Sequence, residues 1–284
     1  MVSKTEDIKT LMRTHQWFKN ILIFAVPFFA GQLFHPNTLL KSILAFISFS
    51  LAASATYVFN DLADIEADRL HPQKKLRPLV QGRISEKESK KLMGILIILS
   101  FVFALPLPTD FLKILLLYLA ISSIYSMGLK RVFLLDVFLV SIGYLLRVLA
   151  GQGATGIPAS SWLLITVFLM ALLISLGKRR VELSTLGIEA SNHRTSLTSY
   201  SLDFIDQAIL ITSSSSLITY ILYTVERGKG LVFTTIPAVY GILRYLQLLR
   251  KGNGGDPIKT FFKDPHLLIS GLILLGAIFV RVYL

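Results

Sequence analysis

Residues 39–68 read LLKSILAFISFSLAASATYVFNDLADIEAD, an apolar run that passes directly into a cluster of carboxylates. A helix needs roughly 20 apolar residues to cross about 30 Å of hydrocarbon, and Leu39–Phe59 meets that length. The polar residues that follow begin where such a helix would leave the membrane. This stretch therefore predicts a membrane-spanning helix that ends in a polar site.

The rest of the chain is similarly apolar. Hydrophobic residues make up 53% of the 284 positions and the mean hydropathy is +0.64, more than a soluble domain contains. We therefore expect a single all-α membrane domain over residues 1–284, in which loops 60–91 and 178–204 form a cap over the active site. The predicted spans are Ile21–Phe34, Leu39–Phe59, Leu92–Leu107, Phe111–Met127, Val132–Ala150, Ser161–Leu176, Ile205–Val225, Leu231–Leu249 and Leu267–Leu284.

Lysine and arginine are distributed unevenly among the segments outside these spans. The formal net charge is +12, and 22 of the 29 lysines and arginines lie in the N-terminus and in segments 60–91, 130–131, 178–204 and 250–264. Cytoplasmic loops are enriched in these residues. We therefore expect a multi-pass protein of the plasma membrane with its N-terminus and active site on the cytoplasmic side and its C-terminus outside. The absence of cysteine excludes disulfides and thiolate catalysis.

Carboxylates gather at the end of the second predicted span, which the distribution of basic residues does not explain. Asn60, Asp61, Asp64 and Asp68 are close in register, and steps of three and four residues return to one face of a helix. Mg²⁺ prefers oxygen ligands and usually binds through one or two carboxylates together with substrate phosphates. The pattern predicts a Mg²⁺ site at these four residues, with the three aspartates catalytic. The alternative is a solvated acidic helix end that neighbouring cations balance.

A basic segment follows the carboxylates. Residues 69–78 contain Pro72 and Pro78, so they cannot form one regular helix. Turns that carry Lys74 and Arg77 could bind phosphate oxygens, and we predict that both side chains contact substrate. The alternative is that these cations only determine the orientation of the chain in the membrane.

A second polar cluster ends the sixth predicted span. Lys178 and Arg179 lie four and three residues before Glu182, so all three share one face of a helix. The cluster predicts an anion site in which Lys178 and Arg179 bind phosphate and Glu182 orients them or contacts a sugar hydroxyl. Lys178 and Glu182 are also candidate catalytic residues. An ordinary surface ion pair is the alternative.

Other single residues complete the set of candidates. Lys19 and Asn20 follow an aromatic stretch near the membrane interface, Tyr125 is near the end of the fourth predicted span, and Lys130 follows that span. We predict that these four residues bind substrate. Arg147 lies inside the fifth predicted span, where a charge is costly, so it is either functional or paired with a buried carbonyl or carboxylate.

The pattern Asn60-Asp61-x-x-Asp64-x-x-x-Asp68 after a second span resembles the UbiA superfamily of intramembrane prenyltransferases, and the resemblance covers nearly the whole chain. It implies about nine helices around a central cavity open to the cytoplasm, with Mg²⁺ between two aspartate-rich motifs. Here Lys178-Arg179-x-x-Glu182-Leu183 stands in place of the second acidic motif. That departure resembles the decaprenyl-phosphate phosphoribosyltransferase branch of the family. The same holds for the stretches Gln16-Trp17-x-Lys19-Asn20 and His71-Pro72-x-Lys74-x-x-Arg77-Pro78.

The resemblance to this branch implies a reaction and its partners. Members transfer 5-phosphoribose from phosphoribosyl diphosphate to a polyprenyl phosphate of the decaprenyl type, release diphosphate, require Mg²⁺ and serve cell wall biosynthesis. One alternative is a prenyltransferase that uses a prenyl diphosphate donor and an aromatic or lipid acceptor, and a less favoured one is a transporter. We expect no nucleic-acid partner, and the sequence leaves homo-oligomer formation and the length of the prenyl chain open.

Overall fold

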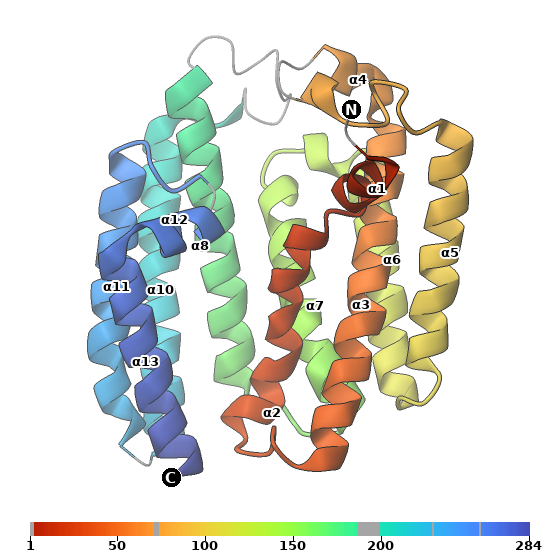
Figure 1. Ribbon diagram of the computed structural model, residues 1–284. Helices are drawn as coiled ribbons and strands as arrows, with labels where there is room; N and C mark the ends of the chain where they lie inside the picture. Colours follow the sequence, from red (N-terminus) through yellow and green to blue (C-terminus); the bar gives the residue numbers. More distant parts are fainter. Residues whose placement is uncertain (1–2, 71–73, 187–198, 229, 256) are drawn as a thin grey trace. The chain divides into compact units, whose positions relative to one another are not determined.

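The computed structural model describes residues 3–70, 74–186, 199–228, 230–255 and 257–284 (Figure 1). Within those ranges seven helical segments are long and apolar enough to cross a membrane, so the chain is a multi-pass membrane protein. The predicted number of nine is not confirmed. The seven segments are α3 (Pro36–Ala63), α6 (Thr109–Met127), α7 (Leu135–Thr155), α8 (Ser161–Leu186), α10 (Leu202–Arg227), η6 with α11 (Leu231–Thr234 and Thr235–Arg250) and α13 (Pro265–Tyr283).

Two predicted spans differ from these seven. The segment predicted at Ile21–Phe34 overlaps a 3₁₀ helix, η1 (Thr14–Phe24), and a short α-helix, α2 (Ala25–Phe29), instead of one long α-helix. The segment predicted at Leu92–Leu107 lies mostly in α5 (Glu86–Ala104), whose first two turns are highly charged. A capping box formed by Ser85 and Glu88 starts α5, which explains why the helix begins in the polar flank.

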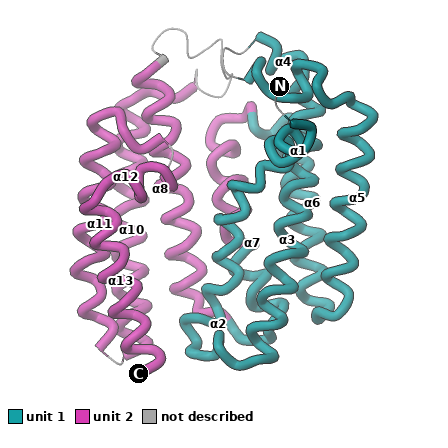
Figure 2. Tube along the Cα trace, in the orientation of Figure 1, with its two compact units in different colours: residues 1–130, 146–158 teal, residues 131–145, 159–284 magenta. Residues whose placement is uncertain are grey.

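The chain divides into two compact units, which Figure 2 colours separately. Unit 1 comprises residues 1–130 and 146–158, and unit 2 comprises residues 131–145 and 159–284, so α7 begins in unit 2 and ends in unit 1. Unit 1 also contains α1 (Lys4–Met12), α4 (Ile65–Arg69) and η2 (Lys74–Leu76). Unit 2 also contains α12 (Pro257–Lys263), and η3 (Leu129–Arg131) lies at the boundary.

Small residues let α3 pack closely against its neighbours in unit 1. Ser48 of α3 and Ser100 of α5 exchange hydrogen bonds, because each hydroxyl donates to the other residue's carbonyl oxygen at 2.8 Å. Both serines are fully buried. Such pairs of small polar residues allow helix backbones to approach in an apolar environment.

The unusual length of η1 has an explanation in its side chains. Side chains three residues apart eclipse in a 3₁₀ helix, so Trp17, Asn20 and Ile23 form one row. Trp17 Nε1 donates to Ser54 Oγ (2.9 Å) and Asn20 Nδ2 donates to Ser50 Oγ (2.8 Å), both on α3. Ile23 is fully buried. These contacts with α3 stabilise a helix type that seldom exceeds one turn.

Unit 2 has its core between α8, α10 and the start of α7. Leu172, Leu173 and Leu176 of α8 pack with Ile205 and Ile209 of α10 in this core. Other faces of the same unit expose large apolar side chains, of which Ile211, Ile236 and Leu272 are examples. A soluble protein rarely exposes so many large apolar side chains, whereas lipid chains cover them in a membrane.

Candidate functional site

The carboxylate motif lies where α3 gives way to α4. The sequence predicted one continuous helical face, but α3 ends at Ala63 and α4 begins at Ile65. Asp64 stands between the two helices with φ −105° and ψ 6°, in the sparsely populated bridge region. The backbone still forms the bond from Asp68 N–H to Asp64 O at 2.8 Å. The chain is therefore kinked at the motif rather than unravelled.

Arginine links two of the three aspartates. Arg77 Nη1 donates to Asp61 Oδ1 at 3.0 Å and also to Asp68 Oδ2. Arg13 Nη2 donates to the same oxygen of Asp61. Lys74 Nζ lies 3.4 Å from Asp68 Oδ1. The structure thus brings Asp61, Asp68, Arg77 and Lys74 together with Arg13, and the alternative of an acidic helix end balanced by neighbouring cations predicts such ion pairs as well.

Arg13 adopts an unusual backbone conformation. Its φ of 51° and ψ of 48° lie in the left-handed region, which costs a non-glycine residue about 1–2 kcal/mol. It joins α1 to η1, and its guanidinium lies 5.0 Å from the centre of the Tyr57 ring. The basic character of the N-terminus was visible in the sequence, but no spacing rule pointed to a contact with Asp61, 48 residues away.

The third aspartate has a different cation. Lys130 Nζ donates to Asp64 Oδ1 and Oδ2 at 2.5 and 2.6 Å, and to Asn60 Oδ1 at 3.1 Å. Asn60 Nδ2 in turn donates to Asp64 Oδ2 at 3.1 Å. The side chains of Lys130 and Asp64 are each 13% exposed, so this ion pair is largely shielded from water. The sequence proposed both residues for the site, and the structure places them in contact.

The donor set of this motif fits a hard cation that takes part of its coordination from a substrate. Among the described residues no three His, Cys, Asp or Glu side chains converge closely enough to hold a metal ion by themselves. Asp68 Oδ1 is buried and accepts no hydrogen bond from the described residues. Mg²⁺ usually binds through one or two carboxylates and completes its shell with water and substrate phosphates. The oxygens of Asn60, Asp61, Asp64 and Asp68 are suited to that kind of binding.

Two other candidates of unit 1 have different environments. Asn20 is 1% exposed, and its Oδ1 accepts a hydrogen bond from Arg147 Nε at 2.7 Å. Arg147 also donates to the Tyr118 hydroxyl at 3.3 Å and lies over the ring of Phe49. These contacts pair Arg147 with buried polar groups, one of the two roles considered for it. Lys19, the neighbour of Asn20, is only partly buried.

Unit 2 contains the second predicted cluster, on the last turns of α8. Arg179 Nε donates to Asp136 Oδ2 of α7 at 2.9 Å, and Arg179 Nη1 donates to Glu182 Oε2. Lys178 Nζ is 4.0 Å from Glu182 Oε1. The side chains differ in access, because that of Arg179 is 5% exposed and that of Lys178 is 55% exposed. Lys178 is therefore available to a ligand, whereas Arg179 is enclosed between two carboxylates.

Tyr200 supports the same cluster from the segment before α10. Its hydroxyl donates to Asp136 Oδ1 at 2.8 Å and accepts from the Leu134 N–H at 3.1 Å. Leu134 has a φ of 62°, so this bond fixes a strained turn at the start of α7. Burial, with the adjacent Asp136 carboxylate, raises the pKa of the Tyr200 hydroxyl above its usual range. No feature of the sequence identified Tyr200.

For the remaining residues that the sequence proposed for the site, the structure adds little that bears on their role. Tyr125 is partly buried in the last turn of α6. His71 and Pro72 of the basic stretch lie outside the described residues, as do residues 187–198 of the second predicted loop.

Comparison with known proteins shows the family of the chain. Residues 21–272 match the model of the UbiA prenyltransferase family. The chain is 32% identical to the decaprenyl-phosphate phosphoribosyltransferase of Mycolicibacterium smegmatis over 96% of its own length and 91% of that protein. It is also 32% identical to the enzyme of that name from Mycobacterium tuberculosis, over 94% and 91%.

Solved structures show the same fold. A UbiA homologue from Archaeoglobus fulgidus, bound to DMAPP and Mg²⁺, superimposes with a TM-score of 0.76 at 20% identity and covers 98% of this chain and 99% of that one. The chain belongs to the UbiA prenyltransferase family.

Proposed function

We propose that this protein transfers the 5-phosphoribosyl group of phosphoribosyl diphosphate to a polyprenyl phosphate and releases diphosphate. The observation that carries the proposal is the similarity, over nearly the whole chain, to two decaprenyl-phosphate phosphoribosyltransferases. The cationic character of the second motif supports it, because both substrates of that reaction contain phosphates beyond the diphosphate that leaves.

In this proposal the carboxylate motif binds the donor substrate, phosphoribosyl diphosphate. The carboxylates of Asp61, Asp64 and Asp68, with the amide oxygen of Asn60, would hold Mg²⁺ together with the diphosphate. Mg²⁺ bound by these residues would neutralise charge that develops on the leaving diphosphate. Arg77 and Lys130, which contact these carboxylates, offer further hydrogen bonds to phosphate oxygens.

In this proposal the cluster of Lys178, Arg179 and Glu182 binds a phosphate group other than the leaving diphosphate. Lys178 has the most accessible charge of its cluster, so we assign it to phosphate binding. Glu182, which accepts from Arg179, orients these cations or contacts a ribose hydroxyl. Because Arg179 is buried between Asp136 and Glu182, we now assign it to positioning Glu182 rather than to direct contact with substrate.

The bond changes require no general base from the protein. The bond from the anomeric carbon to the diphosphate oxygen breaks, and the electron pair leaves with diphosphate. An oxygen of the polyprenyl phosphate forms the new bond to that carbon. A phosphate monoester has its second pKa near 6, so the acceptor is already largely dianionic at neutral pH. We propose that the reaction takes place on the cytoplasmic side, where most of the lysines and arginines are expected.

Diphosphate release by the detergent-purified protein with Mg²⁺ tests the proposal. One assay contains phosphoribosyl diphosphate and polyprenyl phosphate, and the other contains a prenyl diphosphate and an aromatic acceptor. Release only in the first assay is the expected result. Release only in the second would assign the carboxylate motif to a prenyl diphosphate and overturn the proposed substrates.

The carboxylate assignment has a matched control in the same unit. Asp64→Asn removes a charge from the motif, whereas Asp110→Asn removes one from an exposed pair with Lys113 (2.9 Å). We expect Asp64→Asn to lower kcat by at least about 100-fold, a loss typical of one electrostatic contact in a transition state. Asp110→Asn should leave kcat unchanged. Equal activity of both variants would contradict the metal assignment.

A further inference from the structure

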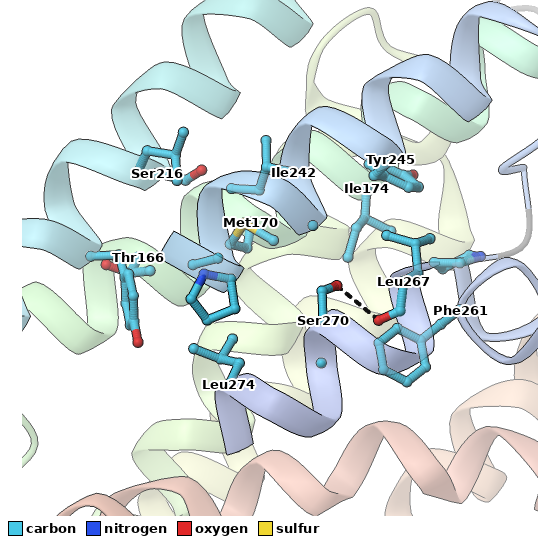
Figure 3. Close-up of a pocket in the computed structure, with 17 residues that line it drawn as sticks. Thr166, Met170, Ile174, Ser216, Ile242, Tyr245, Phe261, Leu267, Ser270 and Leu274 are labelled. Carbon is cyan, nitrogen blue, oxygen red and sulfur yellow. Dashed lines mark hydrogen bonds between the residues drawn. The ribbon is translucent and has the colours of Figure 1, made fainter. Parts of the chain in front are cut away.

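Unit 2 contains a cavity of about 310 Å³ whose lining includes none of the residues assigned to the proposed reaction. Side chains from α8, α10, α11, α12 and α13 line it, and Figure 3 shows Met170, Ile174, Ile242 and Leu274 around it together with Phe261 of α12. The volume is in the range of small-molecule sites in proteins, which begins at about 300 Å³.

The wall of the cavity is almost entirely hydrocarbon in character. No described residue that lines it is charged. Its hydroxyl groups are already bonded within the protein: Ser216 donates to Ser213 O (2.8 Å) and Ser270 donates to Leu267 O (3.0 Å). Thr166 donates to Thr219 at 2.9 Å. A water molecule in a cavity needs two or more polar partners, so this wall is suited to an apolar occupant.

Small residues of α11 and α13 create the space. Ala238 and Gly241 of α11 and Gly271 of α13 line the cavity. A Cβ atom on Gly271 would lie 2.5 Å from Cζ of Phe261, so the aromatic ring is packed directly on that glycine. Protein interiors are otherwise close-packed, so an apolar space of this size in a membrane protein favours a lipid chain as its occupant.

Cations lie at one end of the helices that line the cavity. Lys178 follows the lining residue Ile174 by one turn of α8, and it is exposed. On α12, Lys259 and Lys263 are also exposed, four residues apart, while Phe261 between them lines the cavity. A lipid with its chain among Met170, Ile174 and Ile242 could thus have its phosphate near these cations.

We propose that this cavity binds the hydrocarbon chain of a phosphate-bearing membrane lipid. A polyprenyl phosphate and an anionic phospholipid share this chemistry, and the experiment below distinguishes them. Binding is measured without phosphoribosyl diphosphate, so its failure and the failure of the proposed reaction are separate results.

Photolabelling of the full-length protein tests the site. The probes are phosphatidylglycerol, phosphatidylcholine and polyprenyl phosphate, each with a diazirine on its hydrocarbon chain, and labelled peptides are located by mass spectrometry. We expect label on the cavity segments of α8, α11 and α13. We also expect phosphatidylglycerol to label more than phosphatidylcholine. Displacement of the phosphatidylglycerol label by unlabelled polyprenyl phosphate identifies the acceptor as the occupant, and persistence of that label identifies the phospholipid.

Two matched variants on α11 make the test specific. Ala238→Phe fills the cavity and should reduce labelling at least fivefold, whereas Ile236→Phe adds a similar ring at a side chain that is 70% exposed and should leave labelling unchanged. If Ala238→Phe does not fold, Leu274→Trp fills the cavity from α13. Labelling that is confined to other segments, or equal in the filled variants and the wild type, would overturn the proposal.

The lysines of α12 are tested separately. Each lysine near a membrane surface strengthens the binding of an anionic lipid by about fivefold. The double variant Lys259→Gln/Lys263→Gln should therefore lose most of the preference for phosphatidylglycerol over phosphatidylcholine. An unchanged preference would remove these two residues from the site.

Discussion

Replacement of Asn20 by alanine separates a structural role from the substrate contact that the sequence suggested. Asn20 is buried, donates to Ser50 Oγ at 2.8 Å and accepts from Arg147 Nε at 2.7 Å. A hydrogen bond to a charged group contributes about 1.5–3 kcal/mol and one between neutral groups about 0.5–1.5 kcal/mol. We therefore expect Asn20→Ala to lower the free energy of unfolding by about 2–4 kcal/mol.

Equilibrium unfolding in mixed detergent micelles with increasing SDS measures this change. Asn37→Ala is the control, because Asn37 is exposed in the first turn of α3 and its loss should change stability by less than about 0.5 kcal/mol. The KM for phosphoribosyl diphosphate should not change in the folded fraction of Asn20→Ala. A stable Asn20→Ala protein with a raised KM would refute the reasoning and restore Asn20 as a substrate ligand.

Three further predictions concern packing, the carboxylate motif and the metal. A Cβ atom on Gly151 would lie 2.0 Å from the carbonyl oxygen of Ile23, so Gly151→Ala should destabilise the protein by about 1–3 kcal/mol in the same assay. Gly94→Ala has open space and should stabilise α5 by up to about 1 kcal/mol. Lys130→Met removes the cation that contacts Asp64 and should lower kcat at least tenfold in the diphosphate assay, with the unfolding midpoint as control. EDTA should abolish diphosphate release and added Mg²⁺ should restore it, whereas activity that persists in EDTA would exclude a metal requirement.

The sequence predicted most membrane spans because their hydropathy is a property of each segment alone. The helix type at Ile21–Phe34 was not predictable, because it depends on partners distant in the chain. Trp17 and Asn20 of η1 form hydrogen bonds with Ser54 and Ser50 of α3. The 3₁₀ conformation of η1 is explained only once these two serines are known to face it. A single sequence contains no information on that pairing.

In the candidate site, too, local features were predictable from the sequence and long-range contacts were not. The spacing of Asp61, Asp64 and Asp68 identified the motif, and Arg77 was predicted nearby as a substrate contact. Contacts across long separations were not predictable, which is why Arg13 was missed. Burial was not predictable either, and burial is what distinguishes the enclosed Arg179 from the accessible Lys178.

Mass spectrometry of the lipid product tests the central claim most directly. The purified protein is incubated with phosphoribosyl diphosphate, decaprenyl phosphate and Mg²⁺, and the lipids are extracted. We predict a lipid that has gained one phosphoribosyl group, formed in equal amount with diphosphate, present with Asp110→Asn and absent with Asp64→Asn. If the wild-type protein leaves decaprenyl phosphate unmodified but prenylates an aromatic acceptor, the proposed reaction is contradicted.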